Sequence, residues 1–294
     1  MEMARLGRLA MVAVAALPAL VISPAFAQEA TPAAALLADT GDDGTLTNCV
    51  DPSFPPMEFF ETAESTRPVG FDVDLVNEVG ARLGLTVEHV PTEFTGLLPA
   101  LDAGRCDVVA SGIYLTAERL ATFAAQPYYD TSVVLVTLAD DDAVGSPQDL
   151  AGKTVAVQSG TNYINILNDL NAELEAAGQP TLTVQTYPKQ TDAIQQLIVG
   201  RADATITQDT EAAFRELEQP GMFRIAYTYP DPETFGIYHR PEATALSEAL
   251  AATVEGMRDD GTLAAIAETW GLPVEGAEFS TDAAETVAAA TPGA

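Results

Sequence analysis

The chain has 294 residues, 47% of them hydrophobic, and a formal net charge of −30 from 13 basic and 43 acidic side chains. Nucleic-acid binding is excluded, because a chain with so few basic residues has no patch that could neutralise phosphates. The acids are scattered along the sequence, which is typical of a solvated surface. Such a surface suits either a saline medium or plain solubility, and both explanations stay open.

The first 27 residues have the three parts of a secretory signal peptide. Arg5 and Arg8 form a basic start, residues 9–22 are apolar, and residues 25–27 are an Ala-Phe-Ala cleavage site before Gln28. No cysteine comes directly after this site, so no lipid anchor is expected. The remainder has no apolar run of the roughly 18 residues that a membrane span needs. We therefore predict a soluble, exported protein.

Two stretches at the ends of the mature chain, residues 28–44 and 276–294, are rich in alanine, threonine and acids. Neither has a sustained apolar face, so both are predicted to be flexible. The body between them, residues 45–275, is long enough to bury one large core or two modest ones.

The body opens with a strand over 45–51, a proline-rich loop and a helix over 70–84. Apolar residues in this helix recur every three or four positions, which predicts one buried face. Asp72 and Asp74 lie where a helix start favours negative charge and side-chain caps, and Gly84 suits a helix end. We assign the two acids to the helix start and the sheet, not to a ligand site.

The later elements continue the alternation of β and α, which favours open, doubly wound sheets. Further strands are predicted over 85–90, 153–159 and 181–187, helices over 160–170 and 245–272, and a long β-like passage over 222–242.

A repeat lies inside the body. The segments LDAGRCDVVAS (101–111) and LIVGRADATIT (197–207) share a Gly-Arg-x-Asp turn between an apolar helix and a β-rich strand, at an offset of 96 residues. Matched flanks favour two related α/β lobes over chance similarity. Ligands of such sheets bind beyond the carboxyl ends of the strands, so two lobes would turn those ends toward one cleft. The residues at these ends are 51–54, 111–119, 159–162 and 208–209.

Several motifs for catalysis or cofactor binding are not supported. The AGKT segment at 151–154 precedes a strand, and Pro147 stands where a phosphate-binding loop needs glycine. The chain has no G-x-G-x-x-G, no C-x-x-C and no G-x-S-x-G elbow. His89 and His239 are far apart and are interpreted as structural. We expect no metal and no cofactor.

Two charged residues follow strands in opposite lobes. Arg119 lies in the first turn of a helix opened by Thr116, and Asp209 follows the strand of the second repeat. Considered alone, Arg119 is well explained as a member of a surface ion pair, and Asp209 as the N-cap of a helix. Together, a guanidinium that can clamp a carboxylate and an acid that can accept an ammonium describe a site for a zwitterion.

The helix start Gly-Phe-Asp-Val-Asp-Leu at 70–75 resembles the signature of the family 3 bacterial solute-binding proteins, the polar amino acid class of ABC transport receptors. Six further segments occur in the order found in that family and extend the similarity over essentially all of 45–275. They are DPSFPPMEF, LPALDAGRCDVVASG, LTAER, LAGKTVAVQSGT, GRADATITQD and MRDDGTLAAIAETWG.

The resemblance implies the α/β, two-lobed periplasmic binding protein fold of type II, in which each lobe is an open, mostly parallel sheet flanked by helices. It implies a periplasmic amino-acid-binding component of an ABC transporter, not an enzyme, with lobes that close by hinge bending. Its expected partners are an amino acid and the permease subunits of the inner membrane, and a monomer is expected. The boundaries are signal peptide 1–27, linker 28–44, lobe 1 at 45–131 and 229–275, lobe 2 at 132–228 and tail 276–294, with the crossings near 130–133 and 227–230.

The resemblance also implies site residues. Arg119 matches the clamp for the α-carboxylate, Asp209 the acceptor for the α-ammonium, and Asp51 an acid that meets a cationic side chain in some relatives. The other residues carried over to the ligand site are Phe54, as an aromatic cover, and Ser111, Gly112, Tyr114, Thr161 and Asn162.

Tyr114 departs from the family pattern, because many relatives have serine or threonine there. A phenol changes the shape and the hydrogen bonding of the pocket and so puts the ligand's identity in question. A dehydratase of prephenate or arogenate type is the alternative on the same fold. It would need an acid in the cleft, such as Glu58 or Asp51.

The chain has two cysteines, Cys49 and Cys106. One lies in the first strand and the other enters the strand of the first repeat, and the expected compartment is oxidising. We predict a disulfide between them, with two small buried thiols as the alternative.

Overall fold

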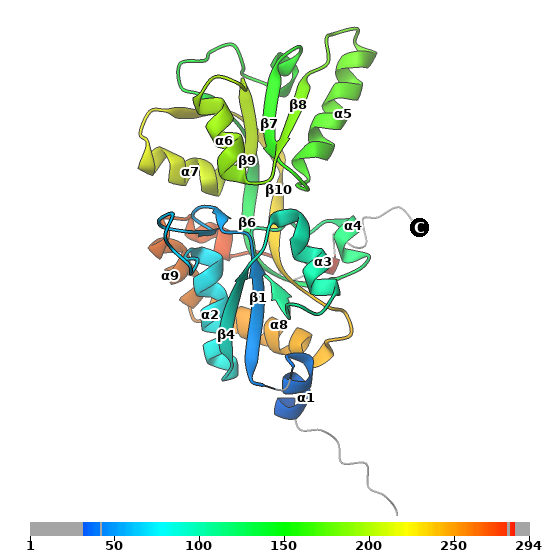
Figure 1. Cartoon of the computed structure of the whole chain (residues 1–294), viewed down its shortest axis with the longest axis vertical. Helices are drawn as coiled ribbons and strands as arrows, with labels where there is room; N and C mark the ends of the chain where they lie inside the picture. The colour runs from blue at the N-terminus through cyan, green and yellow to red at the C-terminus, as the bar shows by residue number, and fades with distance from the viewer. Residues whose placement is uncertain (1–31, 42, 281–282, 286–294) are drawn as a thin grey trace, which may run out of the picture.

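The computed structural model describes residues 32–41, 43–280 and 283–285, so the predicted signal peptide lies outside the described residues. Figure 1 shows two lobes stacked along the longest axis of the molecule and linked by two long strands, β6 (Ala124–Leu138) and β10 (Phe223–His239). Lobe 1 holds the first strands and the last helices of the chain, and lobe 2 holds the middle of the chain.

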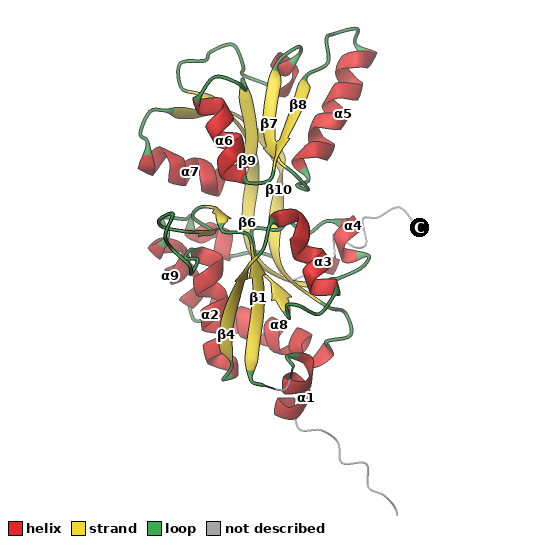
Figure 2. Cartoon of the chain, viewed as in Figure 1, coloured by secondary structure: helices red, strands yellow, loops and turns green. Residues whose placement is uncertain are grey.

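Helices cover the strands in both lobes (Figure 2). The other elements of lobe 1 are α1 (Pro32–Asp39), β1 (Thr45–Val50), β2 (Ser53–Phe54), β3 (Glu58–Phe59), α2 (Phe71–Leu83), β4 (Thr86–Pro91), η1 (Phe94–Gly96), α3 (Leu97–Asp102), β5 (Val108–Val109), α4 (Ala117–Leu120), α8 (Thr244–Asp259), α9 (Thr262–Thr269) and η3 (Val274–Ala277). Those of lobe 2 are η2 (Pro147–Leu150), β7 (Thr154–Gln158), α5 (Tyr163–Ala176), β8 (Thr183–Tyr187), α6 (Gln190–Ile198), β9 (Ala204–Gln208) and α7 (Asp209–Glu218).

In the described part of the chain, eight strands form one sheet in the order β4-β1-β5-β10-β6-β9-β7-β8. Strand β1 is parallel to β4 and β5, and β7 is parallel to β8 and β9. The α/β, two-lobed fold is confirmed. The two lobe sheets are continuous, because the segments that connect the lobes are themselves hydrogen-bonded strands: β6 pairs antiparallel with β10 along most of its length, with β9 on its other side in lobe 2.

The repeat has a structural counterpart in each lobe. Asp107 Oδ2 accepts a hydrogen bond from the backbone N–H of Thr47 at 2.9 Å, and Asp203 Oδ2 accepts one from the N–H of Thr154 at 2.7 Å. Each aspartate also donates its own N–H to the carbonyl of the same threonine. The Gly-Arg-x-Asp turn therefore ties the start of one strand to the start of its neighbour in both lobes.

The described parts of the two flanking stretches contain elements that pack on the body, which the sequence did not predict. Residues 32–39 form α1, and Asp39 Oδ2 accepts a hydrogen bond at 3.0 Å from the N–H of Leu246, in the first turn of α8. Beyond residue 275, Phe279 is buried in the main core beneath the guanidinium of Arg258. Both contacts have one cause, because a few apolar side chains in an otherwise polar stretch suffice to pack it on the body.

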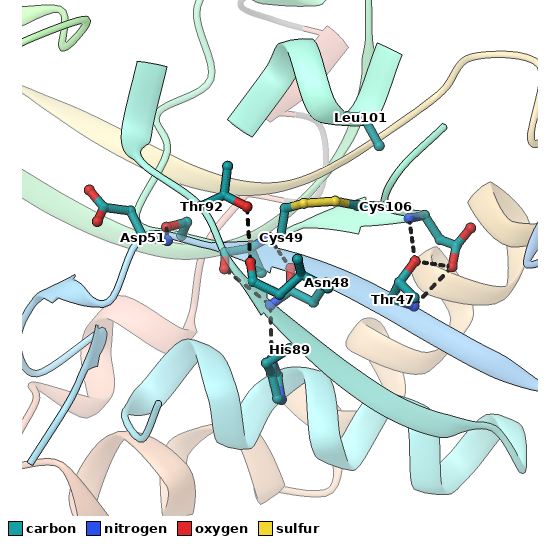
Figure 3. The surroundings of a disulfide bond; sticks show 12 residues. Thr47, Asn48, Cys49, Asp51, His89, Thr92, Leu101 and Cys106 are labelled. Carbon is teal, nitrogen blue, oxygen red and sulfur yellow. Dashed lines mark hydrogen bonds between the residues drawn. A yellow bond between two sulfur atoms is a disulfide. The ribbon is translucent and has the colours of Figure 1, made fainter. Parts of the chain in front are cut away.

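The predicted disulfide between Cys49 and Cys106 is confirmed. The two Cα atoms are 5.7 Å apart, within the range of about 4.4–6.8 Å that a bridge requires. Figure 3 shows that it joins β1 to the segment just before β5. Among the described residues, no helix has the length and apolar character to cross a membrane.

Candidate functional site

A hollow lies between the two lobes. Phe54, Ser111, Gly112 and Tyr114 come to it from lobe 1, and Thr161 and Asn162 from lobe 2, all as the carboxyl-end rule placed them. The full lining is Asp51, Phe54, Glu58, Phe94, Ser111, Gly112, Tyr114, Arg119, Gln158, Thr161, Asn162, Tyr163, Gln190 and Gln208.

Asp51 follows β1 and lies buried in the wall of the cavity. Its backbone N–H donates to Ser111 Oγ at 2.9 Å, and its Oδ2 accepts from Ser53 Oγ at 3.1 Å. Burial raises the pKa of the Asp51 carboxyl to about 6, although Gln158, Ser53 and Lys189 favour its charged form. Asp51 is therefore an anion above about pH 6.

Arg119 is positioned by a short helix, as predicted. Thr116 is the N-cap of α4, and its side chain accepts the N–H of Arg119 at 3.3 Å. One guanidinium nitrogen, Nη1, donates to the carbonyl of Tyr114 at 2.9 Å. No carboxylate in the described part of the chain lies within 4.0 Å of this guanidinium. A cation in a cavity wall without an anionic partner can clamp a ligand carboxylate.

Glu233, on β10, is a carboxyl group whose pKa responds to the charge of Arg119. Burial raises the pKa of Glu233 to about 7, and the positive charge of Arg119 opposes that shift. The raised pKa favours the uncharged form of Glu233 near neutral pH, which leaves the charge of Arg119 less compensated.

The lobe 2 wall is made of neutral side chains that donate and accept hydrogen bonds. Gln158 Nε2 donates across the cleft to Asp51 Oδ2 at 2.6 Å, and Thr161 Oγ1 donates to the carbonyl of Gln158 at 2.8 Å. The side-chain oxygens of Gln190 and Gln208 are buried and have no donor among the described residues. The contact between Gln158 and Asp51 shows that the lobes are closed on each other.

Tyr114 closes one side of the cavity. Its ring stacks on Phe235 of the hinge strand, with centroids 5.6 Å apart and planes 7° apart. Its hydroxyl lies 3.4 Å from the hydroxyl of Tyr163 in the other lobe. The phenol thus adds an aromatic contact between the lobes.

Asp209, predicted as the ammonium acceptor, is not among the lining residues. Its Oδ1 accepts a hydrogen bond from Thr131 Oγ1 at 2.6 Å, and it borders a separate surface hollow with Pro273. The reason is local: β9 ends at Gln208 and α7 begins at Asp209, so the two neighbours point in different directions. In this closed conformation it is Gln208 that points into the cavity.

The two acids of the signature helix do not cap it. Helix α2 begins after Gly70, with no side-chain hydrogen bond at that cap. Gly70 has φ 137°, and a Cβ there would lie 2.2 Å from the carbonyl oxygen of Met57, so the position requires glycine. Asp72 instead accepts the N–H of Gly112 at 2.7 Å, and Asp74 accepts Trp270 Nε1 at 2.8 Å.

Sequence reasoning missed part of the cavity. Gln208 was placed at a strand end but was not assigned to the ligand site, and Gln158, the last residue of β7, lies one residue before the predicted strand end at 159–162. Glu58 was considered only as a catalytic acid. Phe94, Tyr163 and Gln190 lie at the starts of helical segments, and nothing in the sequence distinguished them.

The two histidines lie apart from the cavity lining and from each other. His89 contacts Asn48 and Asn77, and His239 Nδ1 lies 3.0 Å from the carbonyl of Arg240. In the described part of the chain, no group of three or more His, Cys, Asp or Glu side chains could hold a metal ion.

Residues 46–273 match the model of the family described as bacterial extracellular solute-binding proteins, family 3. The chain belongs to this family. A curated relative, the arginine-binding protein ArgT of Corynebacterium glutamicum, is 28% identical over 230 residues, which are 78% of this chain and 75% of the relative.

Two solved structures are similar across the whole two-lobed body. One is an ancestral arginine-binding protein bound to arginine, with a TM-score of 0.70 and 32% identity, covering 77% of this chain and 98% of that one. The other is an ancestral amino acid-binding protein, AncCDT-1, described as a precursor of cyclohexadienyl dehydratase. Its TM-score is 0.70 and its identity 27%, over 80% of this chain and 98% of that one.

Proposed function

We propose that this solute-binding protein captures an amino acid with a cationic side chain, arginine first among them, for an ABC transporter. The observation that carries the proposal is the pairing of charges in one closed cavity. Arg119 has no carboxylate within 4.0 Å among the described residues, and neutral donors hold Asp51, so the wall presents a cationic and an anionic group to the ligand. The names of the arginine-binding relatives agree with this chemistry.

Arg119 receives the ligand's α-carboxylate, with Ser111, Thr161 and Asn162 beside it in the same lining. The guanidinium retains donors that the Tyr114 carbonyl does not use, and these suit a planar carboxylate. Asp51 receives the cationic end of the side chain, and Phe54 and Phe94 cover its aliphatic part.

The α-ammonium has two candidate acceptors. The side-chain oxygen of Gln208 is buried at the cavity and receives no hydrogen bond from the described residues. A donor on the ligand would compensate for the free energy lost when this oxygen was removed from water. Asp209, expected from the resemblance, would reach an ammonium only in a different arrangement of the lobes. We assign the role to Gln208 in the closed form, and variants of both residues decide between them.

The finer cellular assignment is also part of the proposal. Removal of residues 1–27 would release a monomeric protein into the periplasm, where it would exchange ligand with permease subunits in the inner membrane. We place the hinge at residues 130–133 and 227–230, where β6 and β10 pass between the lobes.

The dehydratase alternative has the similarity to AncCDT-1 in its favour. It needs an acid whose proton can reach the substrate. Glu58 Oε1 already accepts Ser111 Oγ at 2.9 Å, and its other oxygen is buried beside Asp72, so Glu58 does not offer such a proton. The geometry therefore favours binding over turnover.

The test has two arms. Mass spectrometry of natively purified protein should detect a co-purified amino acid, and calorimetry should show arginine binding more tightly than glutamine or glutamate. Assays with prephenate and arogenate should show no turnover. Tightest binding of an acidic amino acid would contradict the assigned role of Asp51, and turnover would establish the enzyme.

A further inference from the structure

Two carboxyl groups lie side by side beneath the cavity. Glu58 is on β3, Asp72 is in the first turn of α2, and their relative exposures are 1% and 0%. Glu58 belongs to the lining and Asp72 lies behind it. In the described residues, neither has a lysine, arginine or histidine within 4.0 Å. Two uncompensated negative charges at one buried place would be very unfavourable.

Each carboxyl group has one satisfied oxygen and one unsatisfied oxygen. Glu58 Oε1 accepts Ser111 Oγ at 2.9 Å, while Asp72 Oδ2 accepts the N–H of Gly112 at 2.7 Å and the hydroxyl of Tyr128 at 2.9 Å. Glu58 Oε2 and Asp72 Oδ1 receive no donor from the described residues, yet the two side chains are in hydrogen-bonding contact. Two acceptors in contact are satisfied only when a proton lies between them.

We propose that Glu58 and Asp72 share one proton and act as a pair of positioning residues that hold Ser111 and Gly112 in place for the ligand. Glu58 accepts a hydrogen bond from Ser111 and Asp72 accepts one from Gly112, so the pair holds two consecutive residues of the cavity wall. Arg119 belongs to the same wall. Gly112 has φ 53° and a Cβ there would come within 2.9 Å of the Phe54 ring, so this segment is confined from the cavity side as well.

The charged and titratable groups around the pair agree with a retained proton. Burial and the neighbouring Asp72 raise the pKa of Glu58 well above its ordinary value, and Asp51 adds to the shift. Tyr128 faces Asp72 from β6, and burial beside these two acids raises the pKa of its hydroxyl, so it stays a donor. We assign the proton to Glu58, because Asp72 already has two other donors.

The consequence for the ligand rests on the proposed function. With the shared proton the pair carries one negative charge, and without it two, close to the place of the ligand carboxylate. Loss of the proton also removes the bond between the two side chains and loosens the wall that they hold. The dissociation constant for arginine should therefore rise in alkaline solution, by up to about tenfold per pH unit.

The first experiment needs no ligand. Infrared spectroscopy at pH 7 should show the carbonyl stretch of a buried protonated carboxylic acid in the wild type and still in Glu233→Gln, which removes another carboxyl with a raised pKa. The band that remains in Glu233→Gln should be absent when Glu58→Gln is added and should disappear on alkaline titration. Because the pKa of Glu58 is higher in the folded protein than in the unfolded chain, its proton stabilises the folded state at low pH. The melting temperature should therefore fall as the pH rises through this raised pKa. Glu58→Gln should remove that fall, because its amide donates permanently to Asp72.

The second experiment is arginine calorimetry between pH 7 and 9.5 on the wild type, Glu58→Gln and Asp72→Asn. The amino group of arginine titrates in the same way in the experiments with every variant. A difference between the pH profiles therefore comes from the Glu58–Asp72 pair. Glu58→Gln should lose the alkaline weakening, and Tyr128→Phe should keep it. Asp72→Asn, checked for native circular dichroism, should bind more weakly at every pH.

A wild-type spectrum without the protonated band, or an unchanged band in Glu58→Gln, would overturn the shared proton. Identical alkaline profiles in the wild type and Glu58→Gln would overturn the positioning role. If arginine binds at no pH, the proposed function fails. In that case the infrared band and the pH dependence of the melting temperature still test whether Glu58 and Asp72 share a proton.

Discussion

The two walls of the cleft differ in chemistry. The lobe 1 wall holds the charged groups, Arg119, Asp51 and the Glu58–Asp72 pair, and a disulfide two residues before Asp51 braces its strands. The lobe 2 wall is built from amides and hydroxyls, among them Gln158, Gln190 and Gln208, with no charged side chain in the lining. On the proposed function, the charged groups of lobe 1 select the ligand by its charge. The neutral groups of lobe 2 add hydrogen bonds when the lobes close.

The asymmetry has a physical reason. Charged groups need fixed partners when they are buried, and lobe 1 supplies most of these itself, with one further donor to Asp51 from Gln158 of lobe 2. Removing a neutral amide from water costs less free energy than removing a charged group. Amides therefore suit a surface that is exposed to water when the lobes open and buried when they close. We therefore expect substitutions in lobe 1 to affect affinity more than substitutions in lobe 2.

The largest effect on binding is expected for Arg119→Ala. Removing one side of a buried charged pair costs about 2–5 kcal/mol, or between about thirty- and several-thousand-fold in dissociation constant. Calorimetry with arginine measures the loss, and Glu118→Ala, one residue away and exposed, is the matched control. Arginine binding within a few-fold of wild type in Arg119→Ala would refute the carboxylate clamp.

The covalent brace of lobe 1 can be removed with Cys49→Ser and Cys106→Ser together. The bridge closes a separation of 57 residues, and loss of a native disulfide typically lowers the free energy of unfolding by about 2–5 kcal/mol. Chemical denaturation should show this loss, while reducing agent should have no further effect on the variant. Equal unfolding midpoints in the oxidised and reduced wild type would show that the brace contributes nothing.

Asp51→Asn is expected to weaken arginine binding by about 1.5–3 kcal/mol, because it removes a charge from a charged hydrogen bond. The raised pKa adds a pH dependence whose sign is fixed. The anion is needed for the cationic side chain, so wild-type affinity for arginine should fall as pH drops through about 6. Asp51→Asn should lack this acid weakening, and glutamine, which has no cationic side chain, serves as the control ligand. An acid limb that persists in the variant would assign the titration elsewhere.

The smallest effects are expected in lobe 2. Gln208→Ala removes one neutral acceptor and should cost about 0.5–1.5 kcal/mol, roughly two- to thirteen-fold in affinity. Asp209→Asn should change affinity less than this, because Asp209 does not line the closed cavity. A larger loss in Asp209→Asn than in Asp51→Asn would reverse the comparison and place the main anion in lobe 2.

The sequence predicted the fold and most of the lining for a simple reason. Gly-Arg-x-Asp turns and alternating apolar runs are local signals, and the carboxyl-end rule converts them into a cleft without any knowledge of packing. Asp51, Ser111 and Thr161 were placed in this way. The disulfide followed from the same reasoning, since the cysteines lie on strands that had to be neighbours.

The failures concern side-chain direction and long-range contacts. Whether Gln208 or Asp209 enters the cavity depends on where β9 ends, and an error of one residue reverses the answer. Asp72 resembles a helix cap in sequence, but its partner, Gly112, is 40 residues away. Such a contact arises only when α2 is packed against the sheet, so no local pattern announces it.

The paired hinge strands have a mechanical consequence. A two-stranded ribbon bends readily out of its own plane, since its hydrogen bonds then hardly change length, whereas sliding one strand along the other would break them. In the span between the lobes, β6 and β10 are paired from Val134↔Thr228 to Asp130↔Thr234, interrupted by a register shift between Thr228 and Pro232. The lobes are thus free chiefly to rock about one axis. An incoming amino acid changes the width of the gap, while Asp51 and Gln158 remain aligned to meet each time it shuts.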